Sequence, residues 1–213
     1  MHCLICHNKS EKQIICCGCA ALAKHAKNSC KCCGVKLQNQ EKQCGHCQIS
    51  PPAFSHTYYE AEYKQPIDSW VKSLKFGKNL AMSRLFAEMM LKRLKVIGKE
   101  FVLMSVPLHK SRLRSRGYNQ AYEIAKELAK LSGRKLDNSL KRTKKTDMQA
   151  QLKFKQRAKN VKNAFVSKEN LKNKKIILID DVMTSGNTLR ECARVLKKAG
   201  AEDVRVMVFA RKS

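Results

Sequence analysis

Long apolar runs are absent from this sequence. No segment of its 213 residues approaches the roughly 20 consecutive apolar residues that a helix needs to cross a bilayer. The first residues also lack the basic stretch and the long apolar stretch of a secretion signal. We therefore expect a cytoplasmic protein, either free in the cytoplasm or held peripherally at the inner face of the cytoplasmic membrane.

Acidic residues are scarce as well. The chain has 17 Asp and Glu against 44 Lys and Arg, which gives a formal net charge of +27. Residues 101–175 hold 21 of the basic residues and only 5 of the acidic ones. This charge exceeds what solubility requires, so we expect a polyanionic partner, with nucleic acid favoured over an anionic membrane surface. An ordinary solvated basic face is the alternative interpretation.

Cysteine is almost absent after residue 47 and abundant before it. Ten of the eleven cysteines lie in the first 47 residues, and eight of these form four doublets with two intervening residues. Such a doublet can direct two thiolates at one tetrahedral metal ion, so eight sulfurs suffice for one or two structural Zn²⁺ ions in a zinc ribbon. The expected ligands are Cys3, Cys6, Cys16, Cys19, Cys30, Cys33, Cys44 and Cys47.

Two other interpretations of these cysteines are less favoured. Disulfides belong to secreted chains, and a thioredoxin-like redox role is the third possibility. The extra Cys17 and Cys32 leave the choice of ligands open, as does the question of whether the doublets stack or interleave. Histidines could replace a thiolate, but the cysteines alone satisfy the ligand count. The histidines concerned are His2, His7, His25 and His46.

A boundary between two domains is predicted near residue 50. The cysteines stop there, and Pro51 and Pro52 impose an extended connection. Residues 1–50 are too few to build a core unaided, which favours a metal-stapled module. Residues 51–213 are enough for one domain of ordinary size.

Hydrophobic periodicity after residue 50 alternates between strand and helix. We expect a hood or first hairpin at 54–63, and further strands at 101–107, 175–180 and 203–211. Helices are expected at 67–76, 79–96, 119–131 and 188–199. This order predicts an α/β fold, a mainly parallel sheet with helices on both faces, plus the small N-terminal Cys-rich domain.

A segment near residue 180 has the features of a phosphoribose site. Residues 176–179 suit a central parallel strand, and Asp180 and Asp181 follow at its C-terminal end, where open α/β sheets bind ligands. A helix cap could also explain the aspartates, but a cap needs only one side chain. The next residues offer hydroxyls, a glycine and helix N-terminal amides to a phosphate dianion. These residues are Thr184, Ser185, Gly186, Asn187 and Thr188.

Two basic segments precede this site. Residues 106–120 are expected to form a strand and then a loop with alternating arginines, and 142–149 a mobile flap followed by a short basic helix at 151–161. Arginine suits a bidentate grip on phosphate oxygens, and an aromatic ring can stack on a base. The residues expected to bind pyrophosphate or DNA are Arg112, Arg114, Arg116, Tyr118, Arg142, Lys144, Lys145, Lys153, Lys155 and Arg157.

The segment 174–189 resembles the phosphoribosyl pyrophosphate (PRPP) motif of type I phosphoribosyltransferases. The resemblance implies that Asp180 and Asp181 contact the ribose hydroxyls and that residues 184–188 bind the 5-phosphate. It also implies that Mg²⁺ accompanies PRPP and that the flap closes over the pyrophosphate. Ser185 and Asn187 depart from the commonest residues of the motif but remain small or hydrogen-bonding.

Several motifs in order along essentially the whole chain narrow the resemblance to the ComF family (ComFC, GntX-like). They are the four cysteine doublets, Lys75-Phe76, the run from Arg116 to Gln120, and Asn163-Ala164-Phe165. The family's association with natural transformation implies a protein that binds and handles incoming single-stranded DNA, with PRPP and other DNA-uptake proteins as partners. The alternative is an active phosphoribosyltransferase, which transfers phosphoribosyl from PRPP to an acceptor that no motif identifies. The motifs do not indicate an oligomeric state.

Overall fold

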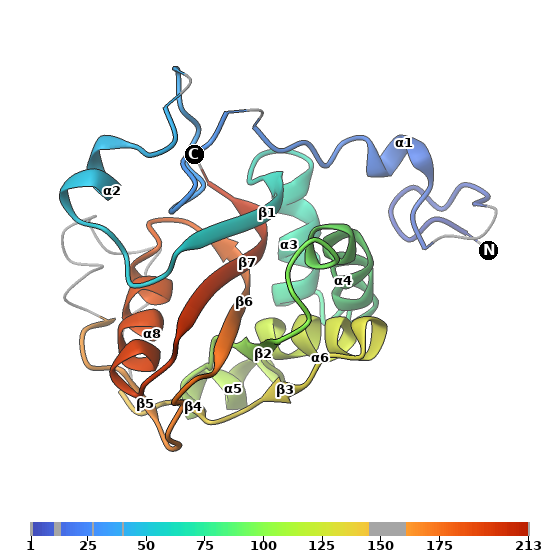
Figure 1. Ribbon diagram of the computed structural model, residues 1–213. Helices are drawn as coiled ribbons and strands as arrows, with labels where there is room; N and C mark the ends of the chain where they lie inside the picture. The colour runs from blue at the N-terminus through green and yellow to red at the C-terminus, as the bar shows by residue number, and fades with distance from the viewer. Residues whose placement is uncertain (1, 11–13, 27, 40, 145–160, 213) are drawn as a thin grey trace.

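The structure is a computed structural model that describes residues 2–10, 14–26, 28–39, 41–144 and 161–212. Five strands form one sheet in which every neighbouring pair is parallel, as predicted (Figure 1). In spatial order they are β1 (His56–Glu62), β7 (Asp203–Arg211), β6 (Lys175–Met183), β2 (Phe101–Ser105) and β3 (Leu136–Asp137).

Helices cover both faces of this sheet (Figure 1). One face carries α3 (Ile67–Phe76), α4 (Ala81–Leu94) and α6 (Gln120–Ser132), and the other carries α8 (Asn187–Lys198). Ile177 and Ile179 of β6 pack with the first group, whereas Ile176 and Leu178 pack with α8. Because successive strand residues point to opposite faces, a strand buried on both sides needs an unbroken apolar run.

The chain connections that follow β2 and β6 run toward opposite edges of the sheet. From β2 the chain passes through α6 to β3, and from β6 it passes through α8 to β7 on the other side. Pairing between β2 and β6 ends at Ser105 and Ile179, while β6 continues to Met183 beside β7. The C-terminal ends of β2 and β6 therefore flank the crevice where doubly wound sheets bind ligands.

Two local predictions need correction, and one feature was not predicted. β1 is not part of a hairpin, because it pairs in parallel with β7 at the edge of the main sheet. Its alternating burial indicates a half-buried strand but not the direction of its partner. The expected loop of arginines is instead helix α5 (Lys110–Arg116), which ends at Gly117 with a φ of 84°. A short antiparallel pair, β4 (Leu140–Arg142) and β5 (Phe165–Ser167), was not predicted.

The N-terminal segment packs against the rest of the chain. It contains the short helices α1 (Cys17–Ala20) and α2 (Gly45–Ile49). Cys3 and Cys19 join the apolar cluster of α3 and α4, and Cys30 and Cys47 join that of α8. The division of the chain into separate domains near residue 50 stays a prediction.

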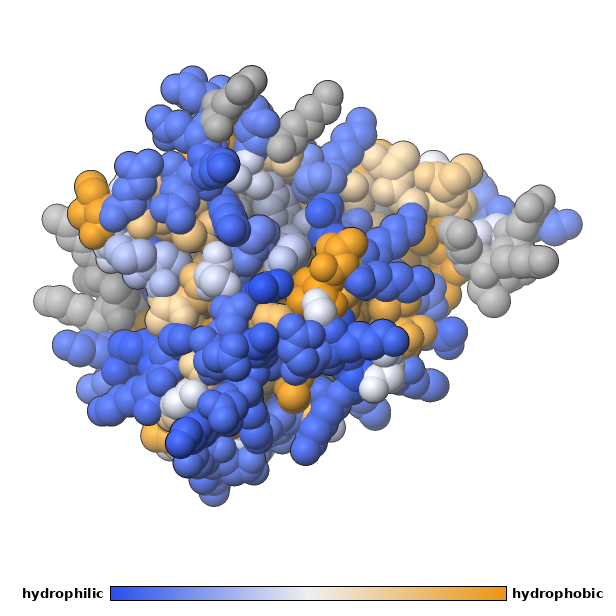
Figure 2. Space-filling model, viewed as in Figure 1, coloured by the Kyte–Doolittle hydropathy of each residue, from blue (hydrophilic) through white to orange (hydrophobic). Residues whose placement is uncertain are grey.

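Polar side chains dominate the molecular face drawn in Figure 2. Among the described helices, none is long and apolar enough to cross a membrane.

Candidate functional site

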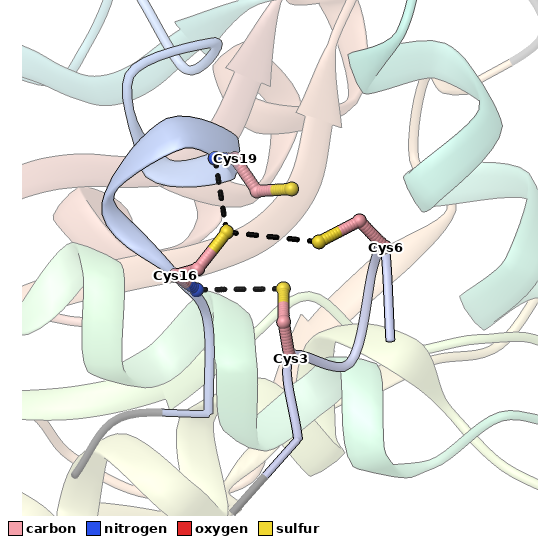
Figure 3. Close-up of side chains that lie close together, drawn as sticks. All are labelled: Cys3, Cys6, Cys16 and Cys19. Carbon is pink, nitrogen blue, oxygen red and sulfur yellow. Dashed lines mark hydrogen bonds between the residues drawn. The ribbon is translucent and has the colours of Figure 1, made fainter. Parts of the chain in front are cut away.

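The eight doublet cysteines converge in two groups of four. Within each group the sulfur atoms all lie within 4.8 Å of one another. Figure 3 shows the first group, in which the four side chains point toward a common centre. The first group is Cys3, Cys6, Cys16 and Cys19, and the second is Cys30, Cys33, Cys44 and Cys47. Sequential doublets therefore pair with each other and do not interleave.

The distances between sulfurs fit a tetrahedral metal ion. Cys6 Sγ lies 3.7 Å from Cys16 Sγ, and Cys33 Sγ lies 3.7 Å from Cys44 Sγ. A disulfide would require about 2.05 Å. Four thiolates at about 2.3 Å from Zn²⁺ stand about 3.8 Å apart. Each cluster can thus hold one structural zinc ion, which would make two ions per chain.

The two clusters are copies of one structural unit. A doublet lies in a turn closed by an isolated β-bridge, between His2 and Lys9 in the first unit and between Ser29 and Lys36 in the second. In both units the other doublet begins a short helix, with its first cysteine at the N-cap. Cys17, Cys32 and the four N-terminal histidines lie outside both clusters.

Backbone amides favour the charged form of one thiol in each cluster. Burial alone would raise the pKa of Cys3, but backbone hydrogen bonds, of which the largest comes from Cys16, lower it to about 6. Burial opposes ionisation of Cys30 too, and backbone hydrogen bonds lower its pKa to about 7. Burial raises the pKa of Cys19 and Cys47. A bound cation would favour the thiolate form of these cysteines.

A cleft of about 510 Å³ opens at the C-terminal ends of β2 and β6. Asp180 and Asp181 lie on one wall, and the loop from Thr184 to Thr188 contributes to another. The cleft is strongly cationic, because six basic side chains line it against these two acids. The basic residues are Lys72, Lys75, Arg112, Arg116, Arg142 and Lys212.

The two aspartates have different surroundings. They lie within β6, which continues past the predicted end at residue 180, so their side chains leave opposite faces of the strand. Asp181 is buried and its carboxylate lies 3.1 Å from Lys75 Nζ. Asp180 accepts a hydrogen bond from the N–H of Asp181 at 2.9 Å. Burial and the charge of Asp181 together raise the pKa of Asp180 to about 7.

The loop that begins at Thr184, which the sequence predicts to bind phosphate, is the phosphate loop. It leads into α8, which has no acidic residue in its first turn. Gly186 is the N-cap of α8 with a φ of 76°, a conformation that favours glycine. Gly186 has no side chain with which to cap this terminus, so the first amides of α8 can bind an anion. Thr184, Gly186 and Thr188 line the cleft, whereas Ser185 and Asn187 do not. The Ser185 hydroxyl is buried without a hydrogen-bond partner among the described residues.

The run from Arg116 to Gln120 forms the corner between α5 and α6. Arg116 Nη1 donates to Gln120 Oε1 at 3.1 Å, and Gly117 adopts the left-handed conformation that ends α5. Asn119 Oδ1 accepts from the N–H of Ala121, which caps α6, while Asn119 Nδ2 donates to the Val106 carbonyl at 3.0 Å. These contacts hold the corner against the end of β2, beside the cleft.

The predicted phosphate-binding residues are not all in one place. Arg112 and Arg116 are one helical turn apart on α5 and line the cleft, whereas the exposed Arg114 does not. Arg142 lines the cleft with its guanidinium 5.3 Å from the Phe165 ring centroid. Lys144 is exposed and does not line the cleft. Most of the predicted flap and basic helix, with Lys145, Lys153, Lys155 and Arg157, lies outside the described residues, whereas Arg142 at the start of the predicted flap belongs to β4.

Tyr118 corrects the expectation of an open stacking surface. Its hydroxyl donates to the Leu74 carbonyl, and its ring is partly buried against the apolar cluster of α3 and α6. Tyr118 thus has a packing role in the described structure, and its sequence position between Gly117 and Asn119 gave no sign of that.

Arg211 is a functional candidate that the sequence did not single out. This buried side chain donates through Nε to the Cys33 carbonyl at 2.7 Å. Its Nη1 donates to the carbonyls of Met183 at 3.1 Å and Thr184 at 2.6 Å. Arg211 therefore joins the second cysteine cluster to the start of the phosphate loop. Only the alignment of β7 beside β6 brings these groups together, so no local pattern could have identified them.

Comparisons with known proteins show the family of this chain. Residues 113–213 match the family model described as phosphoribosyl transferase domain. The chain is 32% identical over 210 residues to "Competence protein F" of Haemophilus influenzae, covering 94% of this chain and 91% of that protein. The chain belongs to the ComF family. It is also 30% identical over 204 residues to "DNA utilization protein YhgH" of Escherichia coli, covering 92% and 90% of the two chains.

A third relative of this ComF family member is "Competence protein ComFC" of Streptococcus pneumoniae. The identity is 27% over 154 residues, covering 70% of this chain and 65% of that protein. The resemblance predicted from the sequence motifs is thereby confirmed, as is the α/β fold of the phosphoribosyltransferase kind with an N-terminal Cys-rich part.

Proposed function

We propose that this ComF protein handles single-stranded DNA during DNA uptake or use, and that its cleft binds PRPP with Mg²⁺. The observation that carries the proposal is the cleft itself, in which two carboxylates, an anion-binding helix terminus and six cations converge. The relatives named for competence and for DNA utilization support the biological setting.

Each part of PRPP has a counterpart in the cleft. Asp180 and Asp181 offer hydrogen-bond acceptors to the ribose hydroxyls, and the N-terminus of α8 offers amides to the 5-phosphate. Carboxylate and phosphate oxygens are the ligands that Mg²⁺ prefers. Arg112, Arg116 and Arg142 can pair with the pyrophosphate oxygens, since guanidinium groups bind phosphate in a bidentate manner.

Single-stranded DNA is proposed to follow the basic surface around the same cleft. Its backbone phosphates would contact the α5 arginines and exposed cations such as Lys144. Binding of this kind has little sequence preference and depends strongly on salt, because bound cations displace counterions from the phosphates.

A titration of a labelled oligo(dT) strand at increasing salt tests the DNA part of the proposal. For about five neutralised phosphates, the logarithm of affinity should fall against the logarithm of salt with a slope near −3.5, since each phosphate contributes about −0.7. Duplex DNA should bind less tightly, and Mg²⁺ with PRPP should compete with the strand. Equal affinity for duplex or an affinity independent of salt would contradict the proposal.

Charge-matched variants locate the interaction. Arg112→Gln with Arg116→Gln removes two cations from the cleft and should flatten the salt slope. Arg84→Gln with Lys95→Gln removes the same charge from outside the cleft and should leave the slope nearly unchanged. In Haemophilus influenzae lacking Competence protein F, this chain should restore transformation, while the cleft variant should not.

Phosphoribosyl transfer to an acceptor is a second candidate function. It is favoured because the proposed PRPP site adjoins an exposed aromatic side chain, Phe76, in the same cleft. Release of pyrophosphate from PRPP that depends on an added nucleobase would support it.

A further inference from the structure

One large aromatic side chain stands exposed at the cleft. Phe76, the last residue of α3, is 69% exposed and lines the cleft. Its neighbour Lys75 is held by the ion pair with Asp181, so the ring is attached to a residue anchored at the ribose end of the site. A planar apolar group in this position is available to a ligand that also reaches the carboxylates.

The guanidinium of Arg116 lies next to the Phe76 ring. Its guanidinium carbon lies 5.4 Å from the Phe76 ring centroid, within the range of a cation–π contact. The same guanidinium donates to Gln120, which also lines the cleft. Gln120 has a buried amide nitrogen with no acceptor among the described residues. An aromatic face and a guanidinium plane therefore lie next to one another in the cleft.

Resting on the proposed function, we propose that Phe76 and Arg116 form a subsite that stacks one nucleobase at the mouth of the PRPP cleft. A nucleobase has a π-face that can stack on an aromatic ring and on a guanidinium plane. Six cations line the cleft, so an apolar peptide would bury charges there, whereas a base linked to phosphate complements them. The base belongs either to a strand of DNA or to a free acceptor. Tyr118 is a poorer candidate, because it does not line the cleft and its ring is partly buried against the apolar cluster of α3 and α6.

The first experiment compares oligo(dT) with an abasic strand of equal length. The wild-type protein should prefer the base-containing strand by roughly fivefold or more, since stacking on one aromatic residue contributes at least about that factor. Phe76→Ala should remove this preference while keeping the salt slope and the binding of Mg²⁺ with PRPP. Val96→Ala, which truncates a residue that is 80% exposed outside the cleft, should preserve the preference.

The second experiment identifies the source of the base. Phe76→Trp should retain the preference and provide a fluorophore, whose emission can be separated from that of the buried Trp70 by a Trp70→Phe background. Quenching by oligo(dT) alone would assign a DNA base, and quenching by free purines or pyrimidines in the presence of Mg²⁺ with PRPP would assign an acceptor base.

The outcomes separate this inference from the proposed function. If the wild-type protein binds DNA but Phe76→Ala keeps the full preference for bases, or if no base quenches Phe76→Trp, the stacking subsite is wrong and the proposed function stands. If the wild-type protein binds neither DNA nor PRPP, the proposed function itself fails. Circular dichroism should show that the Phe76 and Val96 variants are folded, because both are surface residues. The Trp70→Phe background replaces a core residue, so its binding of oligo(dT) and of PRPP is first compared with that of the wild type.

Discussion

Replacing Arg211 by methionine should weaken both the fold and the phosphate loop. The guanidinium is buried and donates to the backbone carbonyls of Cys33, Met183 and Thr184. Methionine keeps part of the apolar stem but offers no donor. The substitution should therefore leave three carbonyls with reduced hydrogen bonding, two of them at the entrance of the phosphate loop.

The magnitude depends on two opposing effects. A buried polar group that loses its partner costs about 1–3 kcal/mol. The Met183 carbonyl keeps the N–H of Lys212 as a donor, so the loss falls on the carbonyls of Cys33 and Thr184 and amounts to about 2–6 kcal/mol. Removing a buried cation also relieves its desolvation, which offsets part of that loss. We expect a net loss of about 2–4 kcal/mol, and for a chain of this length each kcal/mol lowers Tm by about 2–4 °C.

Urea denaturation and calorimetry with PRPP would measure the two effects. Arg205→Met is a matched control on the same strand, because Arg205 is partly exposed and pairs with Asp203 at 3.0 Å. Such a pair contributes less than about 1 kcal/mol. Arg211→Lys should fall between the wild type and Arg211→Met, since one ammonium cannot reproduce the planar fork. The reasoning is refuted if Arg211→Met is no more destabilising than Arg205→Met and binds PRPP as the wild type does.

Three further predictions concern the metal, the acids and pH. Elemental analysis should find about two zinc ions per chain, and removing them with a chelator should unfold the N-terminal segment and weaken PRPP binding; less than about one ion per chain would contradict the assignment. Asp180→Asn with Asp181→Asn should lower PRPP affinity at least tenfold with only a small change in stability, because loss of the ion pair between Asp181 and Lys75 is offset by relief of the repulsion between the two carboxylates. Undiminished binding in calorimetry would show that these acids do not hold the ribose. Because the pKa of Asp180 is raised to about 7, the folded protein binds more protons than the unfolded chain between about pH 4 and pH 7. The free energy of unfolding should therefore decline, relative to that of Asp180→Asn, as pH rises through this window, and parallel pH profiles would speak against it.

The local sequence pattern was sufficient to predict the central strand and the positions of the two acids and the glycine that follow its apolar run. Residues 176–179 are apolar because both faces of β6 are covered, and the acids and the glycine come within the next seven positions. Periodicity likewise predicted α3 and β7 with the observed bounds. In each case the signal lies within one element, so the sequence alone carries it.

Features that depend on distant partners were missed. The alternation in β1 shows which residues are buried but not that β7 pairs with it in parallel. The arginines of α5 alternate as in an extended segment, yet only Arg112 and Arg116 share the helical face that meets the cleft. The sequence allowed the ring of Tyr118 either to stack on a ligand or to pack inside the protein, and only the fold shows that its hydroxyl donates to the Leu74 carbonyl. These outcomes are decided by tertiary contacts, which override local preference.

Tertiary contacts also connect the second cysteine cluster to the phosphate loop. Spacing alone allowed its four sulfurs to combine with those of the first cluster, but the fold seats it on α8 and β7. Arg190 of α8 donates to Cys47 Sγ at 3.6 Å and to the Ser50 carbonyl at 2.9 Å, and Arg211 reaches Cys33 from 178 positions away. Both arginines also belong to elements that frame the phosphate loop. A metal ion that orders the second cluster would thereby order the loop, whereas loss of metal from the first cluster, which packs with α3 and α4, should affect the loop less.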